Sequence, residues 1–169
     1  QSSFSVNNVA LVNGRPRTLN LKDLIKYFVR HRHEVILRRT RFDLDKAQKR
    51  AHILEGLLKA LDVIDEIIRI IRASKSVEDA KAELMSTFAF TEIQATAIVE
   101  MRLRQLTGLE REKLQSEYDE LMKFIKYCED VLANEDMQFG IIKDETLEMK
   151  EKYGDARRTE IALSAEEFN

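Results

Sequence analysis

The feature that most constrains the fold is a long apolar stripe between Thr107 and Tyr153. Alternating steps of four and three residues keep side chains on one side of a helix and form the seam of a coiled coil. We therefore expect one long helix, roughly 70 Å in length, that lies along a partner helix and holds two bodies apart. All but two of the stripe positions are apolar: Leu114, Tyr118, Leu121, Ile125, Cys128, Leu132, Glu135, Phe139, Ile142, Thr146, Met149 and Tyr153.

Composition supports an all-α fold, because 34% of the 169 residues are charged and there are only five Gly and one Pro. A single Cys excludes an internal disulfide, and we expect Cys128 to be a buried seam residue rather than a reactive thiol. No apolar run reaches about 18 residues and no leader pattern opens the chain. We expect a cytoplasmic protein, and the start at Gln1 suggests a piece of a longer one.

The chain is predicted to form a long antiparallel two-helix coiled coil with a small globular helical tip, preceded by short β-strand remnants. Local signals set the boundaries: Asn13-Gly14 favours a tight turn, and Asn20, Ser76, Thr91 and Thr107 are helix caps. Spaced apolar residues that begin at Phe4 predict one or two short strands around this turn. The expected segments are the end of a preceding domain at 1–19, an outgoing helix at 20–56, the tip at 57–106, a returning helix at 107–154 that ends at Gly154, and a tail at 155–169.

Charge is distributed unevenly along the chain. Residues 1–61 carry 13 Lys/Arg against 5 Asp/Glu, which leaves 15 against 25 for residues 62–169. The segment 30–50 is strongly basic, and Lys and Arg can displace the counterions of a nucleic-acid backbone. The alternative interpretation is a solvated helix face supported by the pairs Glu34–Arg38 and Asp45–Lys49. The candidate DNA-backbone contacts are Arg30, Arg32, Arg38, Arg39 and Arg41.

The tip is too small to bury all of its apolar side chains in a private core. Since most soluble oligomers are two-fold dimers, we expect a homodimer through the tip, centred on residues 88–109. The candidate dimer contacts are Phe90, Ile98, Met101 and Arg102.

Several catalytic and metal-binding arrangements are not indicated. His31 and His33 are two residues apart and point to different sides of a helix, unlike a zinc-binding i, i+4 pair. The sequence contains no Gly-rich phosphate loop, Cys cluster or nucleophile–base pair. We therefore predict no catalytic, cofactor-binding or metal-binding residue in this chain.

Five stretches resemble the DNA-cleaving polypeptide (the A protein) of bacterial type IIA DNA topoisomerases. They are most similar to the gyrase branch of this family, and the same region of the topoisomerase IV branch is the alternative. They cover nearly the whole chain in order and spacing: Val9–Pro16, Val29–Arg32 with Arg38–Thr40, Arg50–Leu57, Met101–Glu110 and Tyr153–Ile161.

The resemblance implies paired long helices with a globular tip behind a DNA-cleaving domain. Two copies would meet tip to tip and form the exit gate for a transported duplex, within an A2B2 holoenzyme that performs ATP-dependent double-strand passage and negative supercoiling. Mg2+ and ATP would belong to the gyrase B protein. The family's nucleophile is a Tyr after an Arg, whereas Tyr27, Tyr118, Tyr127 and Tyr153 follow other residues, so this chain is expected to be inactive alone.

The sequence leaves open two interpretations that assign the chain to other functional classes. One is a stand-alone coiled-coil adaptor without a role on DNA. The other is a helical nucleic-acid-binding module that uses residues 30–50, for which steep salt dependence of binding would be the signature.

Overall fold

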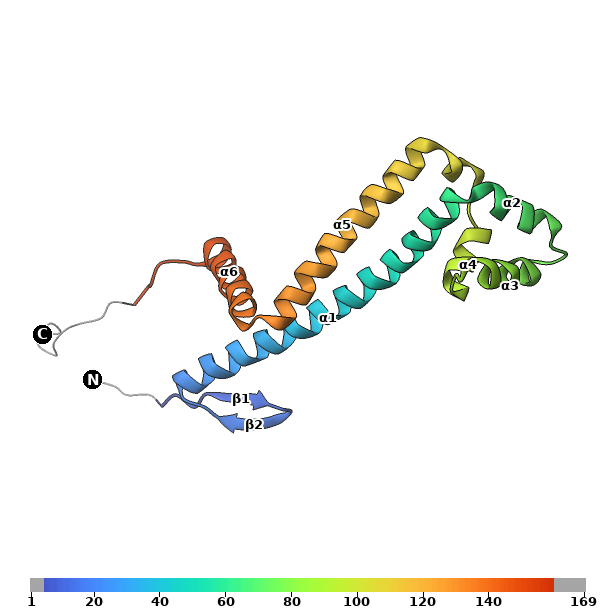
Figure 1. The fold of residues 1–169 in the computed structure, drawn as a ribbon. Coiled ribbons are helices and arrows are strands. Elements are labelled where there is room, and N and C mark those ends of the chain that lie inside the picture. The colour runs from blue at the N-terminus through green and yellow to red at the C-terminus, as the bar shows by residue number, and fades with distance from the viewer. Residues whose placement is uncertain (1–4, 160–169) are drawn as a thin grey trace, which may run out of the picture. The chain divides into compact units, whose positions relative to one another are not determined.

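The computed structural model describes residues 5–159, which divide into two compact units (Figure 1). The hairpin unit comprises residues 5–36 and 136–159, and the arm unit comprises residues 37–135. Helix α1, Leu21–Asp62, contributes residues to both units. Over the described residues, none of the helices combines the length and apolar character that a membrane span requires.

The predicted strands form a two-stranded antiparallel hairpin, β1 Val9–Val12 and β2 Arg15–Thr18. Val12 lies opposite Arg15, which leaves a two-residue turn. Asn13 and Gly14 both have positive φ, 52° and 74°, as a type I′ turn requires. The strand prediction is therefore confirmed where the structure describes it, whereas Phe4 lies outside the described residues.

Helix α1 begins where predicted, because the Asp23 backbone N–H donates to Asn20 Oδ1 at 2.8 Å. It does not end at Gly56, as the sequence led us to expect, but continues to Asp62. At Gly56 the backbone lies so close to α4 that an added Cβ would stand 2.6 Å from Gln94 Cγ and 2.8 Å from Gln94 Cβ. Gly56 is therefore required for close helix packing and not for helix termination.

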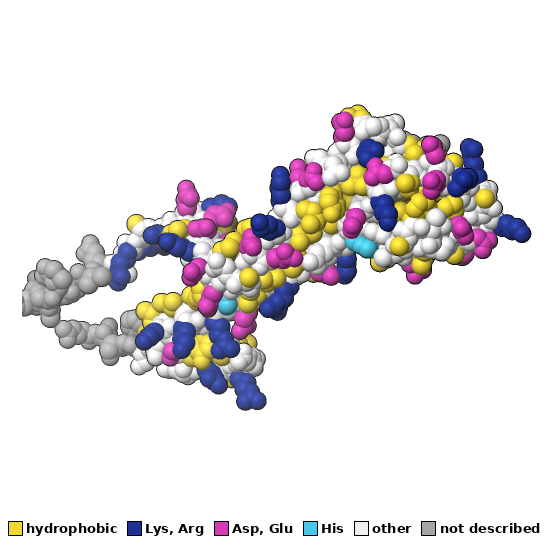
Figure 2. Space-filling view, in the orientation of Figure 1, with side chains coloured by type: hydrophobic (Ala, Val, Ile, Leu, Met, Phe, Trp, Pro, Cys, Tyr) yellow, Lys and Arg dark blue, Asp and Glu magenta, His cyan; other side chains and the backbone are white. Residues whose placement is uncertain are grey.

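In the arm unit, α1 pairs with helix α5, Gly108–Ala133, in antiparallel orientation. Ala47 and Ala51 of α1 pack with Ile125 of α5 in a small apolar cluster. Further along α1, Arg50 pairs with Glu117 of α5. Hydrophobic side chains form a band along this helix pair and continue over the tip (Figure 2). The coiled-coil prediction therefore describes the arm unit correctly.

The returning helix is not continuous, and this corrects the sequence prediction. Asn134 has extended backbone angles, φ −123° and ψ 110°, and separates α5 from helix α6, Glu135–Tyr153. Beyond the break the predicted stripe is followed only in part. The predicted seam residue Ile142 is buried, whereas Phe139 is substantially exposed and Gln138, outside the stripe, is buried. One extended residue is enough to interrupt a 3-4 repeat, and Asn is a weak helix former.

Four short elements form the tip: α2 Ile64–Ala73, α3 Val77–Phe88, α4 Glu92–Val99 and the 3-10 helix η1 Leu103–Leu106. The predicted caps are confirmed, since Ser76, Thr91 and Thr107 each accept a backbone N–H three residues on. The helix that Thr91 caps ends at Val99. The tip core joins α1, the tip helices and α5 through Leu54, Leu57, Ala60, Leu61, Ile67, Leu84, Phe90, Ala95, Ile98 and Leu114.

Candidate functional site

Two basic residues of α1 in the hairpin unit, Arg30 and Arg32, are engaged by carboxylates. Arg30 Nε lies 3.3 Å from Glu34 Oε1, so Glu34 pairs with Arg30 and not with Arg38, the partner predicted from spacing. Arg30 also borders a hollow of about 120 Å³ between the hairpin and α1, which Asn13 and Tyr27 help to line.

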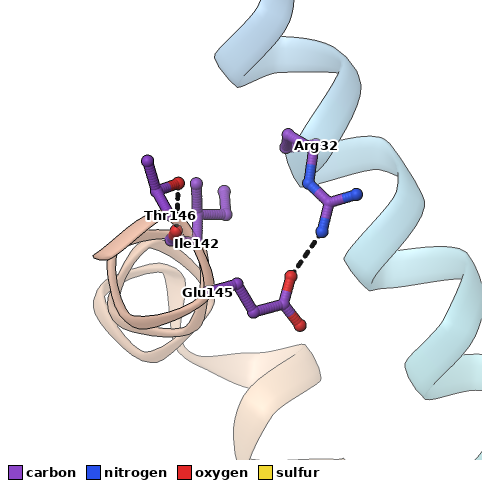
Figure 3. A network of polar contacts seen from close by, with 4 residues as sticks. All are labelled: Arg32, Ile142, Glu145 and Thr146. Carbon is purple, nitrogen blue, oxygen red and sulfur yellow. Dashed lines mark hydrogen bonds and ion pairs between the residues drawn. The ribbon is translucent and has the colours of Figure 1, made fainter. Parts of the chain in front are cut away.

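Arg32 of α1 points toward Glu145 of α6 (Figure 3). The neighbouring His33 also contacts α6. The Arg32 guanidinium donates to Glu145, and the two side chains are 33% and 28% exposed. The His33 ring stacks on Phe139 with centroids 5.0 Å apart, and its Nε2 lies 2.6 Å from Gln138 Oε1. Arg32 is therefore a half-buried ion-pair partner and not a free cation.

The basic residues in the arm unit are more accessible. Arg38, Arg39 and Arg41 lie on the same helix, and Arg38 and Arg41 are on the side away from the buried Thr40 and Ala47. Arg38 and Arg41 are exposed, as a contact with a phosphate backbone would require. The predicted pair Asp45–Lys49 is confirmed, at 2.6 Å.

Arg50 and Glu117 form a two-point contact between α1 and α5. Arg50 Nε and a terminal guanidinium nitrogen donate to the two Glu117 carboxylate oxygens at 2.7 and 3.0 Å. This hydrogen bonding raises the pKa of the Arg50 guanidinium, against an opposing effect of burial. The forked geometry is directional and fixes the register of the two helices. Arg50 is therefore a structural residue of the arm.

The tip contains the residues nominated for dimer contacts, and two of them need correction. Phe90 and Ile98 are 4% and 2% exposed and belong to the chain's own core, so an intact tip does not present them to a partner. Met101 is half-buried against the same core, and Arg102 is exposed. The surface near this place carries other apolar groups instead, including Ile93 on α4, which is 61% exposed.

A polar network that sequence reasoning missed joins α1 to the start of α4. His52 Nε2 lies 2.7 Å from Thr91 Oγ1, and the Gln94 amide donates to the His52 carbonyl at 2.8 Å. Gln94 also closes a capping box with Thr91. The S/T-x-x-Q pattern predicted the helix cap at Thr91. No local pattern predicts the contact of His52 with Thr91, because the two residues are 39 positions apart.

No group of three or more His, Cys, Asp or Glu within residues 5–159 is placed to hold a metal ion. Among the tyrosines, Tyr118 packs beside the apolar core, and Tyr127 stacks on Phe124 with centroids 6.4 Å apart. Tyr153 is largely exposed at the end of α6. These contacts place the three tyrosines in packing or surface roles.

Cys128 is expected to react slowly with alkylating reagents in the folded chain. Its side chain is buried on the α5 seam, and burial, with smaller contributions from the charges of Asp43 and Glu129, raises the pKa of the thiol. A raised pKa lowers the thiolate fraction at a mildly alkaline pH, and the thiolate is the nucleophile. Alkylation with iodoacetamide, followed by mass spectrometry, should be at least about tenfold slower than in denaturant. Equal rates in the two conditions would contradict a buried Cys128.

Comparison with known proteins places this chain in a family. The family model for the A polypeptide of DNA gyrase and topoisomerase IV matches residues 1–147. The chain is 53% identical over 163 residues to the DNA gyrase A polypeptide of Staphylococcus epidermidis, and 54% identical over 163 residues to that of Streptococcus pneumoniae. It is 52% identical over 161 residues to that of Clostridium acetobutylicum.

These matches cover 95–96% of the chain but only 18–20% of the relatives' length. The chain therefore spans about a fifth of these curated relatives.

Proposed function

Because the chain belongs to the family of DNA gyrase and topoisomerase IV A polypeptides, we propose that it forms the coiled-coil arms and the dimerising exit gate of a type II topoisomerase. In this role it guides a transported DNA duplex out of the enzyme during ATP-dependent strand passage and negative supercoiling. The observation that carries the proposal is the match to gyrase A polypeptides over nearly the whole chain. The antiparallel α1–α5 pair is consistent with an arm.

The proposed dimer contact is on the surface of the tip. Ile93 and Leu109 are 61% and 65% exposed, although the core beneath them is closed. Both lie within the predicted centre at residues 88–109, which also contains exposed Arg102. A few apolar side chains with a polar rim suit an interface that has to open, whereas a continuous apolar core is typical of an obligate dimer.

The proposed DNA contact is weak and independent of base sequence. Arg38 and Arg41 point away from the packed face of α1, where they can reach phosphates without contacting bases. A duplex that passes through must be released, and backbone contacts of this kind weaken steeply with salt.

The chemistry itself is proposed to belong to other parts of the assembly. The strand-cleaving nucleophile would lie elsewhere in the A polypeptide. ATP and Mg2+ would be bound with the help of the gyrase B protein. We propose that the assembly works in the cytoplasm, where bacterial DNA is located.

Replacing Ile93 with Asp is expected to weaken dimerisation at least about tenfold, because an apolar contact at the centre of a small interface becomes a charge that must be desolvated. Light scattering on the wild type and on Ile93→Asp at micromolar concentrations measures the effect, with helicity followed by circular dichroism. Val77→Asp is the matched control, since Val77 is an exposed apolar residue of the tip outside the predicted centre.

A monomeric wild type would refute the tip dimer. Equal dimerisation of Ile93→Asp and the wild type would place the contact elsewhere.

A further inference from the structure

The acidic helix α6 contacts α1 at Arg32 and His33 within the hairpin unit. Residues 136–153 carry five Asp or Glu against three Lys. Where it contacts α6, α1 carries Arg32 and His33. Closer to its start, α1 also carries Lys22, Lys26 and Arg30. The helix pair therefore places the Glu145 carboxylate beside Arg32, a cation that would otherwise attract phosphate.

The closest contact between these helices is the Arg32–Glu145 ion pair (Figure 3). About two thirds of each side chain is shielded from solvent, so the attraction is screened less than at the surface. A carboxylate and a phosphate compete for the same guanidinium donors, because both accept forked hydrogen bonds from Arg.

Helix α6 has other contacts that keep it in place beside Arg32. The stacked His33 and Phe139 rings and the His33–Gln138 hydrogen bond join α6 to α1 one residue further along α1. Ile142 and Ile36 are buried in the same unit. Removing the Glu145 charge should therefore release Arg32 without releasing the helix.

We propose that Glu145 is an internal competitor for DNA phosphate at Arg32, so that α6 holds down the affinity of α1 for a duplex. This inference rests on the proposed function, in which α1 touches a transient DNA segment. While Glu145 is paired with Arg32, a phosphate can bind Arg32 only by displacing the carboxylate. Each such contact then gains one ion pair and loses another. The surface can then meet DNA without retaining it.

The test is the affinity of this chain for a short blunt DNA duplex, measured by fluorescence anisotropy from about 50 to 200 mM salt. Glu145→Gln should bind roughly threefold more tightly at the lowest salt, because one ion pair with phosphate is gained. The slope of log affinity against log salt should steepen by about 0.9, the value for one further phosphate contact. Glu145→Asp should give a smaller gain at unchanged net charge, because its shorter side chain draws the carboxylate back from Arg32.

Two controls separate this effect from net charge. Glu151→Gln removes a charge from an exposed position on the same helix and should change affinity little. Arg32→Gln combined with Glu145→Gln should show no gain over Arg32→Gln alone. Circular dichroism confirms that helicity is retained, and Glu145→Asp provides the decisive comparison if the Gln variant loses helix.

The outcomes distinguish the two proposals. The proposed competition at Arg32 would be overturned if the Glu145 and Glu151 variants bound DNA with equal affinity. It would also be overturned if Glu145→Gln still increased the affinity after Arg32 had been replaced. Either result would leave the proposed DNA contact of α1 intact. Undetectable binding of every variant at the lowest salt would overturn both the competition and the proposed contact of α1 with DNA.

Discussion

Replacing Ile98 with Asp is expected to unfold the tip. Ile98 is 2% exposed and packs in the cluster that joins α1, the tip helices and α5. An aspartate there would bury a charge without a partner, and the variant should lose at least about 4 kcal/mol of unfolding free energy. Urea denaturation followed by circular dichroism measures this loss.

Ile93→Asp is the matched control for this experiment. It places the same charge on the same helix, but at a residue that is mostly exposed. At protein concentrations too low for dimerisation, its unfolding free energy should change by less than about 0.5 kcal/mol. If the two variants were equally stable, the assignment of Ile98 to the core would be wrong. Ile98→Asp therefore tests folding of the tip, and Ile93→Asp tests its surface.

Replacing Gly56 with Ala is expected to destabilise the chain by about 2 kcal/mol, although Ala is the better helix former. The added Cβ would stand 2.6 Å from Gln94 Cγ, so the buried Gln94 side chain has to move. That movement disturbs the hydrogen bonds of Gln94 to the His52 carbonyl and the Thr91 N–H. Thermal and urea denaturation provide the measurement.

Gly140→Ala provides a control of opposite sign. Gly140 is also inside a helix, but an added Cβ there meets no atom within 4 Å. This variant should gain up to about 1 kcal/mol from helix propensity alone. The Gly56 cost should also shrink in a Gln94→Ala background, where Cγ and the amide are absent. An undiminished cost in that background would show that the clash is with the Gln94 Cβ, which alanine retains 2.8 Å away, and not with the rest of the side chain.

Local signals predicted the local structure well. Asn13-Gly14 forms the turn, and Thr91 with Gln94 forms a reciprocal cap, because these motifs depend on residues close together in the chain. The seam between Leu114 and Ile125 was also predicted correctly, since a stripe needs only the helical period. Turn, cap and periodicity signals of this kind were enough to predict the all-α fold class.

The remaining features depend on contacts that periodicity does not determine. Helix α4 is apolar around most of its circumference, so the sequence could not tell buried Ile98 from exposed Ile93. Glu34 has an arginine four residues away on each side, and spacing alone could not choose Arg30. Arg32 and Glu145 are 113 positions apart, beyond any local rule.

The corner between α3 and α4 has a consequence for how the tip keeps its shape. Ala89 has a φ of 56°, a left-handed conformation that costs an L-residue about 1 kcal/mol or more. Lys59 of α1 secures the residues on both sides of it: its Nζ donates to the Phe88 carbonyl at 2.7 Å and lies 5.1 Å from the centre of the Phe90 ring. An ammonium group on another helix thus helps to maintain the direction in which the chain leaves α3, together with the packing of Phe90 in the core. Acetylation of that lysine would remove the charge, and the left-handed corner would lose the contact that opposes its relaxation.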